Sequence, residues 1–159
     1  MYTGNSISKT VKDSKYSVSS EGYPYIATKD IVDNNKINYD NGIKIPINER
    51  NFKHSPPNSL LLCIEGGSAG RKMAVNEQMI CFGNKLCNFT PYGFDSKWLF
   101  LYIQSSAFYI NFQSNMSGII GGVGLNKLKE IIIPLAPINE NNKIIQGVGL
   151  LYQKIAQLD

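Results

Sequence analysis

The sequence has 159 residues, of which 43% are hydrophobic and 18% are charged, and this composition excludes general disorder. The length suits a single domain that buries a core of its own. The net charge of +4 is mildly basic, so it permits an anionic partner without requiring one.

The compartment can be inferred from the N-terminus and the cysteines. The first ten residues are polar, and no apolar run approaches the roughly 20 residues that cross a bilayer. Cys63, Cys81 and Cys87 are odd in number and lie among apolar neighbours, which predicts buried thiols in a reducing compartment. We therefore expect a cytoplasmic protein without membrane contact.

The first two thirds of the chain read as short strands. Residues 23–31, "YPYIATKDI", are aromatic and β-branched, which predicts a strand. Residues 36–47 predict a hairpin, because Asn41-Gly42 can supply the positive φ values of a type I′ turn. The apolar run "NSLLLCIEGG" predicts a buried central strand. Three further short strands are expected in "RKMAV", "QMICF" and "KLCNF".

The sequence pattern changes from strand-like to helix-like after Pro91. Residues 95–115 predict one or two helices, with Asp95 or Ser96 as the N-cap. Residues 118–128 form a glycine-rich loop, and residues 130–135 predict a last short strand that ends at Pro134. We expect the fold class to be mixed α/β (α+β), with one compact domain over residues 1–135.

Residues 136–159 predict a terminal helix of the coiled-coil type. Its apolar positions recur at steps of four and three residues, and they are Ile144, Val148, Leu151, Ile155 and Leu158. Gly147 and Gly149 each cost about 1 kcal/mol relative to alanine, so the helix needs a packing partner. We interpret it as a helix-pairing interface, and folding back onto its own domain is the alternative.

Motifs that would carry catalysis are incomplete. "EGGSAGRK" (65–72) lacks the Lys-Ser or Lys-Thr that ends a P-loop. We interpret it as a strand-to-strand loop whose glycines let another backbone approach, with a plain solvated hairpin as the alternative. "GIIGGVG" (118–124) lacks dinucleotide-binding spacing, and "SPPN" (55–58) lacks the aromatic residue that stacks a flipped base. His54 is the sole histidine. We predict no catalytic residue, metal site or cofactor.

Several stretches, taken in order, resemble the specificity subunit of type I restriction–modification enzymes. "TGNSISK" followed by "YPYIATKDI" is similar to the opening of that family, and "IEGGSAGRKMAV" with "CFGNKLCNFTP" is similar to its central glycine loop and following strands. "GLNKLKEIIIPLAPINE" resembles the junction into its conserved helix. Ala136 and Asn141 depart from the usual proline and glutamine of that junction.

The resemblance implies a target recognition domain at residues 1–135 and the start of a conserved spacer helix at 136–159. Such a domain reads one half of a bipartite site in double-stranded DNA. It directs a modification (methyltransferase) subunit and, through it, a restriction subunit, without being an enzyme itself. Because full family members carry two such domains, the chain is either a fragment or a half-length subunit that pairs, for example as a homodimer through its C-terminal helix.

A half-site reader needs cations for phosphates and loop side chains for base edges. The phosphate candidates are Lys9, Lys12, Lys15, Arg50, Lys53, Arg71 and Lys72. The base-reading candidates are Thr28, Lys29, Ser68, Arg71, Asn84 and Lys85. Two alternatives stay open: a module that docks the modification subunit through its helix without reading DNA, and a small enzyme of unrecognised type.

Overall fold

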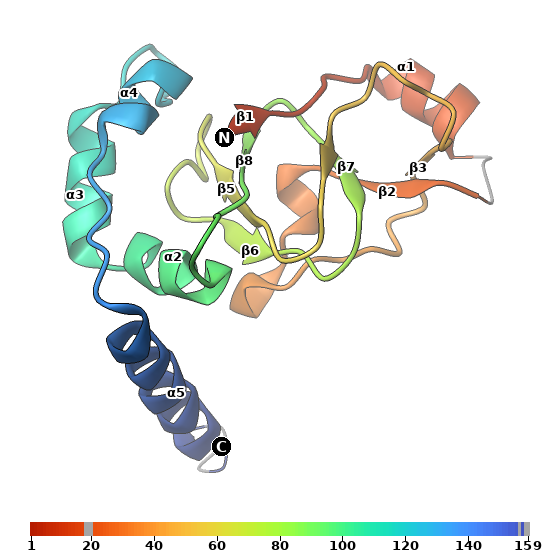
Figure 1. Cartoon of the computed structure of the whole chain (residues 1–159). Helices are drawn as coiled ribbons and strands as arrows, with labels where there is room; N and C mark the ends of the chain where they lie inside the picture. The colour runs from red at the N-terminus through yellow and green to blue at the C-terminus, as the bar shows by residue number, and fades with distance from the viewer. Residues whose placement is uncertain (18–20, 156, 158–159) are drawn as a thin grey trace.

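The computed structural model describes residues 1–17, 21–155 and 157, and Figure 1 shows a domain of two sheets flanked by helices. The first sheet has the order β1-β8-β5-β6 and is antiparallel throughout. Its strands are β1 (Tyr2–Thr3), β8 (Leu86–Phe89), β5 (Leu60–Cys63) and β6 (Met73–Val75). The second sheet has the order β3-β2-β7-β4. Its strands are β3 (Lys44–Ile45), β2 (Tyr23–Ile26), β7 (Ile80–Phe82) and β4 (His54–Ser55).

Strand β5 is the centre of the core, as its uninterrupted apolar sequence predicts. Leu60 and Leu62 pack into the cluster shared with the helices, whereas Leu61 and Cys63 pack into the cluster between the sheets. All four residues are fully buried. Because both faces of β5 are covered, residues on either face must be apolar, and this explains why its sequence does not alternate apolar and polar residues.

Helices cover the outer face of the first sheet. They are α2 (Ser96–Ile103), α3 (Ser106–Ser114) and α4 (Leu125–Glu130). The Asp95 side chain accepts a hydrogen bond from the Lys97 amide and caps α2, and the Ser105 hydroxyl caps α3 in the same way. The sequence predicts one or two helices with Asp95 or Ser96 as the N-cap, and the structure shows two helices, the first capped by Asp95. A short α1 (Lys9–Val11) continues into a π-helical turn at Lys12–Tyr16 near the second sheet.

The hairpin predicted at residues 36–47 is wrong. Ile45 pairs with Tyr23 of β2, and Ile37 forms an isolated bridge with Ile31 instead. The side chain of Asn41 donates to the Tyr25 carbonyl at 2.8 Å and accepts from the Ile43 amide at 3.0 Å. A type I′ turn needs positive φ at both central residues, and of Asn41 and Gly42 only Gly42 has one, at +78°. The edge of β2 gives Ile45 a buried position in place of the predicted hairpin. Strand β2 itself ends at Ile26, earlier than predicted.

The strand predicted at residues 130–135 is also wrong, because α4 ends at Glu130 and the next residues, 131–137, are extended without a ladder partner. Side chains of α2 hold this segment instead. The Trp98 indole donates to the Pro134 carbonyl and the Tyr102 hydroxyl donates to the Ile132 carbonyl, both at 2.9 Å.

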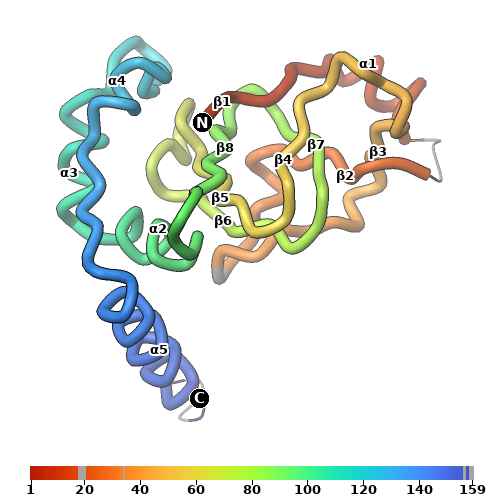
Figure 2. Tube along the Cα trace, in the orientation of Figure 1, coloured from red at the N-terminus to blue at the C-terminus, as the bar shows by residue number. Residues whose placement is uncertain are grey.

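Helix α5 (Ile138–Ile155) confirms the predicted terminal helix and contacts α2 near its start. Figures 1 and 2 show it extending away from the sheets. Ile144, Leu151 and Ile155 are exposed, with more than half of Leu151 and Ile155 accessible, and Val148 is half-buried. Leu158 lies outside the described residues. None of the helices in the described part of the chain combines the length and apolar character needed to cross a membrane.

Candidate nucleic-acid interface

Three loops from separate parts of the chain meet at one end of the two sheets: residues 27–30, 65–72 and 83–85, which we call the loop surface. The Gly83 amide donates to the Ile26 carbonyl, and the Ile64 amide donates to the Lys85 carbonyl, each at 2.9 Å. The Lys72 ammonium donates to the Thr28 carbonyl at 3.3 Å. The sheet order therefore brings together candidates that lie up to 57 residues apart in the sequence, from Thr28 to Lys85.

The loop 65–72 is shaped by its glycines. Gly66 and Gly70 have φ values of +86° and +73°, a backbone conformation that residues other than glycine rarely adopt. A Cβ at Gly70 would lie 2.8 Å from the ring of Phe112 in the core. The Gly66 amide donates to the Gly121 carbonyl at 2.8 Å. The loop joins β5 to β6, as predicted, but the space that Gly70 leaves is filled by the Phe112 side chain, and a Cβ at Gly66 or Gly67 would meet no backbone atom within 4 Å. The interpretation that these glycines admit another backbone is therefore not confirmed.

A basic groove lies beside the loop surface. It consists of two cavities of about 240 and 380 Å³ that share Lys12, Tyr25 and Lys29 among their lining residues. Lys85 and Asn84 also line the first cavity, and Lys9 lines the second. Four predicted lysines thus line one groove, together with the acidic residues Asp13 and Asp30 of the second cavity. Four positive charges against two negative ones leave the lining net basic, as contact with a phosphate backbone requires.

Tyr25 and Asp30 also form part of the wall of the basic groove. The Lys12 ammonium lies 4.8 Å from the centroid of the Tyr25 ring, and the Tyr25 hydroxyl donates to the Asn5 carbonyl at 2.7 Å. Burial raises the pKa of Tyr25 to about 12, so this hydroxyl stays neutral at physiological pH. The buried carboxylate of Asp30 accepts from the Ala27 amide at 2.8 Å and fixes the turn that carries Thr28 and Lys29.

The candidates of loop 65–72 differ in their freedom to bind. Arg71 is exposed, and its guanidinium donates to the Gly67 carbonyl of the same loop. Ser68 is half-buried, and its carbonyl accepts from the amides of Arg71 and Lys72. Because the half-buried Lys72 bridges to Thr28, it braces two loops together. Lys85 lies 3.7 Å from Glu65, and both side chains are about half-exposed, so this ion pair contributes little stability.

The remaining candidates lie along the segment 49–53 and not in the basic groove. Lys15 forms an ion pair with Glu49, and that hydrogen bond is the main cause of its raised pKa. The Lys53 ammonium donates to the Thr3 carbonyl at 2.8 Å, and Arg50 is exposed nearby in sequence. These three cations do not line the basic groove.

Sequence reasoning missed several polar residues of the groove. Ser6 and Tyr25 line its first cavity, while Asn41 lines the second. Ser6 lies in a polar run that gave no signal, and Tyr25 was read as an ordinary strand residue. Asn41 was assigned to a hairpin turn, so its contribution to a cavity could not be anticipated.

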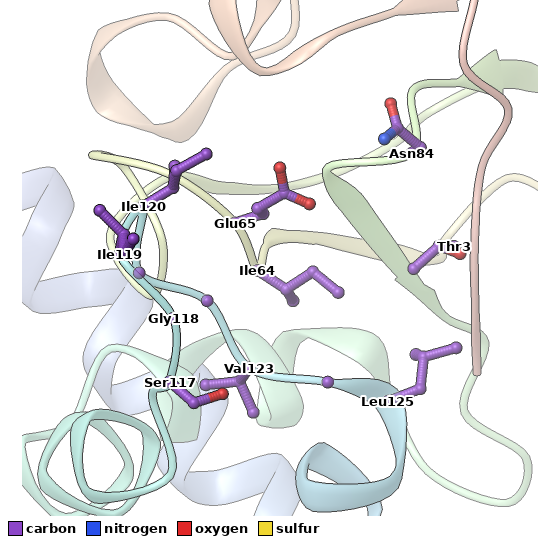
Figure 3. Close-up of a pocket in the computed structure, with 13 residues that line it drawn as sticks. Thr3, Ile64, Glu65, Asn84, Ser117, Gly118, Ile119, Ile120, Val123 and Leu125 are labelled. Atoms are coloured by element: carbon purple, nitrogen blue, oxygen red, sulfur yellow. The ribbon is translucent and has the colours of Figure 1, made fainter.

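A larger cavity of about 840 Å³ lies next to the loop surface (Figure 3). Ile64 and Glu65 follow strand β5 at its back, and the loop 117–125 forms one side. Asn84 lines both this cavity and the basic groove. Asn84 therefore lies between the two hollows.

Two features of an enzyme site can be assessed in the described residues: a group that could hold a metal and a nucleophile. No group of three or more His, Cys, Asp or Glu side chains there is placed to hold a metal ion. Burial raises the pKa of Cys81 and of Cys87 to about 12, which disfavours the reactive thiolate. The His54 ring lies against Tyr23, with 5.0 Å between ring centroids, and its Nε2 atom is buried without a hydrogen-bond partner.

Comparison with protein families decides the assignment. The profile described as "Type I restriction modification DNA specificity domain" matches residues 4–157, which is nearly the whole chain. The chain belongs to this family. The resemblance that the sequence motifs indicated is thereby confirmed, and so is the mixed α/β fold class of this specificity domain.

Solved structures support the same fold. The HsdS subunit from Thermoanaerobacter tengcongensis is 20% identical with a TM-score of 0.70, over 98% of this chain and 35% of that one. The type I restriction–modification S subunit from M. genitalium is 17% identical with a TM-score of 0.60, and the match covers 98% of this chain and 37% of that one. A chain from a structural study of complex assembly and conformational transition of the type I R-M system is 19% identical with a TM-score of 0.73, and the match covers 98% of this chain and 36% of that one.

The specificity domain described here thus spans about a third of the length of these structural relatives. A comparison with curated proteins returned no match.

Proposed function

We propose that this chain is a DNA-reading half of the specificity component of a type I restriction–modification system, reading one part of a bipartite site. The observation that carries the proposal is the gathering of Lys9, Lys12, Lys29 and Lys85 around one groove beside Thr28 and Asn84. In this arrangement the lysines hold phosphates and fix the register of the duplex. The loop side chains then address base edges in the major groove.

The lysines of the basic groove serve affinity, while Ser68, Arg71 and Asn84 serve sequence preference. Arg71 is suited to a bidentate contact with guanine, and the amide of Asn84 to one with adenine. Lys72 acts by bracing the loops through its bond to the Thr28 carbonyl. Lys15, Arg50 and Lys53 form a second phosphate contact at the flank of the same duplex.

In this proposal residues 1–135 form the recognition domain and residues 136–159 form the start of a spacer helix. The exposed apolar residues of α5 pair with a second helix, either in another copy of this chain or elsewhere in a longer subunit. The chain is non-catalytic and cytoplasmic. It directs a modification subunit to DNA and, through that subunit, a restriction subunit.

A selection of randomised duplex DNA by the purified chain at low salt tests this function. Enrichment of a motif of a few base pairs supports a half-site reader, and two copies of the motif at fixed spacing would add that helices pair. Retention without any motif, lost as salt rises, would refute sequence reading. The docking-module alternative would then lead, because the exposed apolar face of α5 remains available to a modification subunit.

A variant pair separates the groove from general charge. Lys12→Ala with Lys29→Ala should lower the slope of log affinity against log salt by about 2, since each phosphate contact adds about 0.9. Lys143→Ala on α5 removes an exposed lysine outside the groove and should leave the slope unchanged. An equal change in both variants would contradict the assignment of the groove.

A further inference from the structure

The loop that joins α3 to α4 is held tightly despite its four glycines. The Ser117 amide donates to the Gly122 carbonyl at 2.9 Å, which closes the loop on itself. The Gly66 amide donates to the Gly121 carbonyl at 2.8 Å, and the Val123 amide donates to the Ile64 carbonyl at 2.9 Å. These bonds fix the loop against the end of β5, so its tip has a defined position beside loop 65–72.

Two isoleucines form that tip, and neither is buried. The exposed fraction is 108% for Ile119 and 72% for Ile120, whereas Val123 of the same loop is 2% exposed. An isoleucine left in water forgoes the favourable transfer that drives apolar side chains into cores. A rigid loop that buries one apolar residue and presents two others has the form of a contact surface.

The position of the Ile119–Ile120 tip indicates its partner. Figure 3 shows the tip on one side of the large cavity and Asn84 on the other, with Glu65 between them. Asn84 also lines the basic groove, so a ligand that lies in the groove and extends past Asn84 reaches the tip. The hydrogen bond between Gly66 and Gly121 places the tip beside the loop that carries Arg71.

A partner for this surface must present anionic groups to the lysines and apolar groups to the tip within a short distance. Duplex DNA meets both conditions, because its phosphates flank a major groove in which each thymine displays a 5-methyl group. We propose that the Ile119–Ile120 tip is a specificity determinant that contacts thymine methyl groups in the major groove. This inference rests on the proposed DNA-reading function and adds an apolar contact with the thymine methyl group to the hydrogen bonds that the polar loop residues make.

The test compares duplexes that carry thymine or deoxyuridine in the motif enriched by the selection described above. Deoxyuridine keeps base pairing and removes the methyl group. Binding of the unaltered chain, measured by fluorescence anisotropy at low salt, should weaken about fourfold for each contacted methyl that is lost. The double variant Ile119→Ser/Ile120→Ser should bind both duplexes equally. Ile132→Ser is the matched control, since Ile132 is 85% exposed on a segment outside the loop surface.

The outcomes separate this inference from the function on which it rests. If the selection returns no motif, the DNA-reading function itself fails. If a motif is returned but contains no A·T pair, or if deoxyuridine binds as well as thymine, the tip does not read methyl groups and the inference alone is overturned. If the double variant keeps its preference for thymine but loses affinity for the modification subunit, the tip is a protein-docking site and the inference is likewise overturned.

Discussion

Gly70→Ala should destabilise the domain by roughly 3 kcal/mol. Gly70 has φ +73°, a conformation that costs an L-residue with a Cβ about 1–2 kcal/mol. The new Cβ would also lie 2.8 Å from Cδ1 and 2.9 Å from Cε1 of Phe112. That ring is fully buried between α3 and the sheet, and overpacking of such a site costs about 1–3 kcal/mol. The two terms together give the expected loss.

Gly67→Ala is the matched control, because Gly67 lies in the same loop and a Cβ there meets no atom within 4 Å. Its φ lies outside the left-handed range, so the substitution should change stability by less than about 1 kcal/mol. Urea unfolding followed by far-UV circular dichroism gives the free energy of unfolding of each variant, provided that the m-values agree.

A loss below about 1 kcal/mol for Gly70→Ala would refute the reasoning, because either contribution alone should exceed that value. Equal losses in the two variants would also refute it, since they would show that the loop responds to any side chain and not to contact with Phe112.

Three further predictions concern the core and the terminal helix. Asn76→Ala should lower the free energy of unfolding, measured by urea denaturation, by roughly 3 kcal/mol. The buried Asn76 side-chain amide donates to three carbonyls, and its Oδ1 accepts from the Ser59 backbone amide. Folding raises the pKa of the Cys81 and Cys87 thiols from 9.0 to about 12. The stability that each thiol contributes should therefore be fully present below pH 9 and be lost from pH 9 to 12 by up to about 1.4 kcal/mol per pH unit, beside a loss above pH 10 from Tyr25, whose pKa is also raised to about 12. Cys81→Ala should reduce the slope between pH 9 and 10. Leu151→Asp should abolish any self-association that light scattering detects, and Lys143→Ala should preserve it.

Short buried strands could be predicted from the sequence because their composition left few alternatives. The runs around Leu61, Ala74, Cys81 and Cys87 became β5, β6, β7 and β8 with little change in their bounds. Each is an apolar run too short for a helix and bounded by turn residues, so local composition and tertiary burial favour the same state.

Where the prediction failed, a distant partner replaced a local one. Asn41-Gly42 is a strong hairpin signal, but Ile45 found a buried place beside Tyr23 on the edge of β2. The triple isoleucine at 131–133 looks like a strand, yet hydrogen bonds from Trp98 and Tyr102 fix its backbone without a ladder. In both cases the deciding contact joins residues that are far apart in the sequence, and the shortest separation is the 22 positions from Tyr23 to Ile45. The periodicity of apolar residues within a short segment cannot predict such a contact.

The candidate site was predicted as a set of residue types and not as a surface. Charge and loop chemistry selected Lys12, Lys29 and Lys85, but their proximity depends on the parallel pairing of β2 with β7. The same criteria selected Lys15 and Lys53, which lie elsewhere because Glu49 and the Thr3 carbonyl hold them. Charge and loop polarity give no signal for an apolar residue at a loop tip, such as Ile119.

The architecture separates the parts that fold from the parts that contact a ligand. Strand β5 is buried on both faces, and the loop that follows it is fixed at Gly66 and Gly70 by contacts with Gly121 and Phe112. Between and beside these anchors the side chains of Ser68 and Arg71 are accessible. Substitutions at the accessible positions leave the core contacts intact, whereas substitutions at the anchors shift the whole loop. In the proposed function this arrangement has an advantage, because the anchored backbone holds Ser68 and Arg71 in position while substitutions of those side chains change the base contacts without refolding the domain.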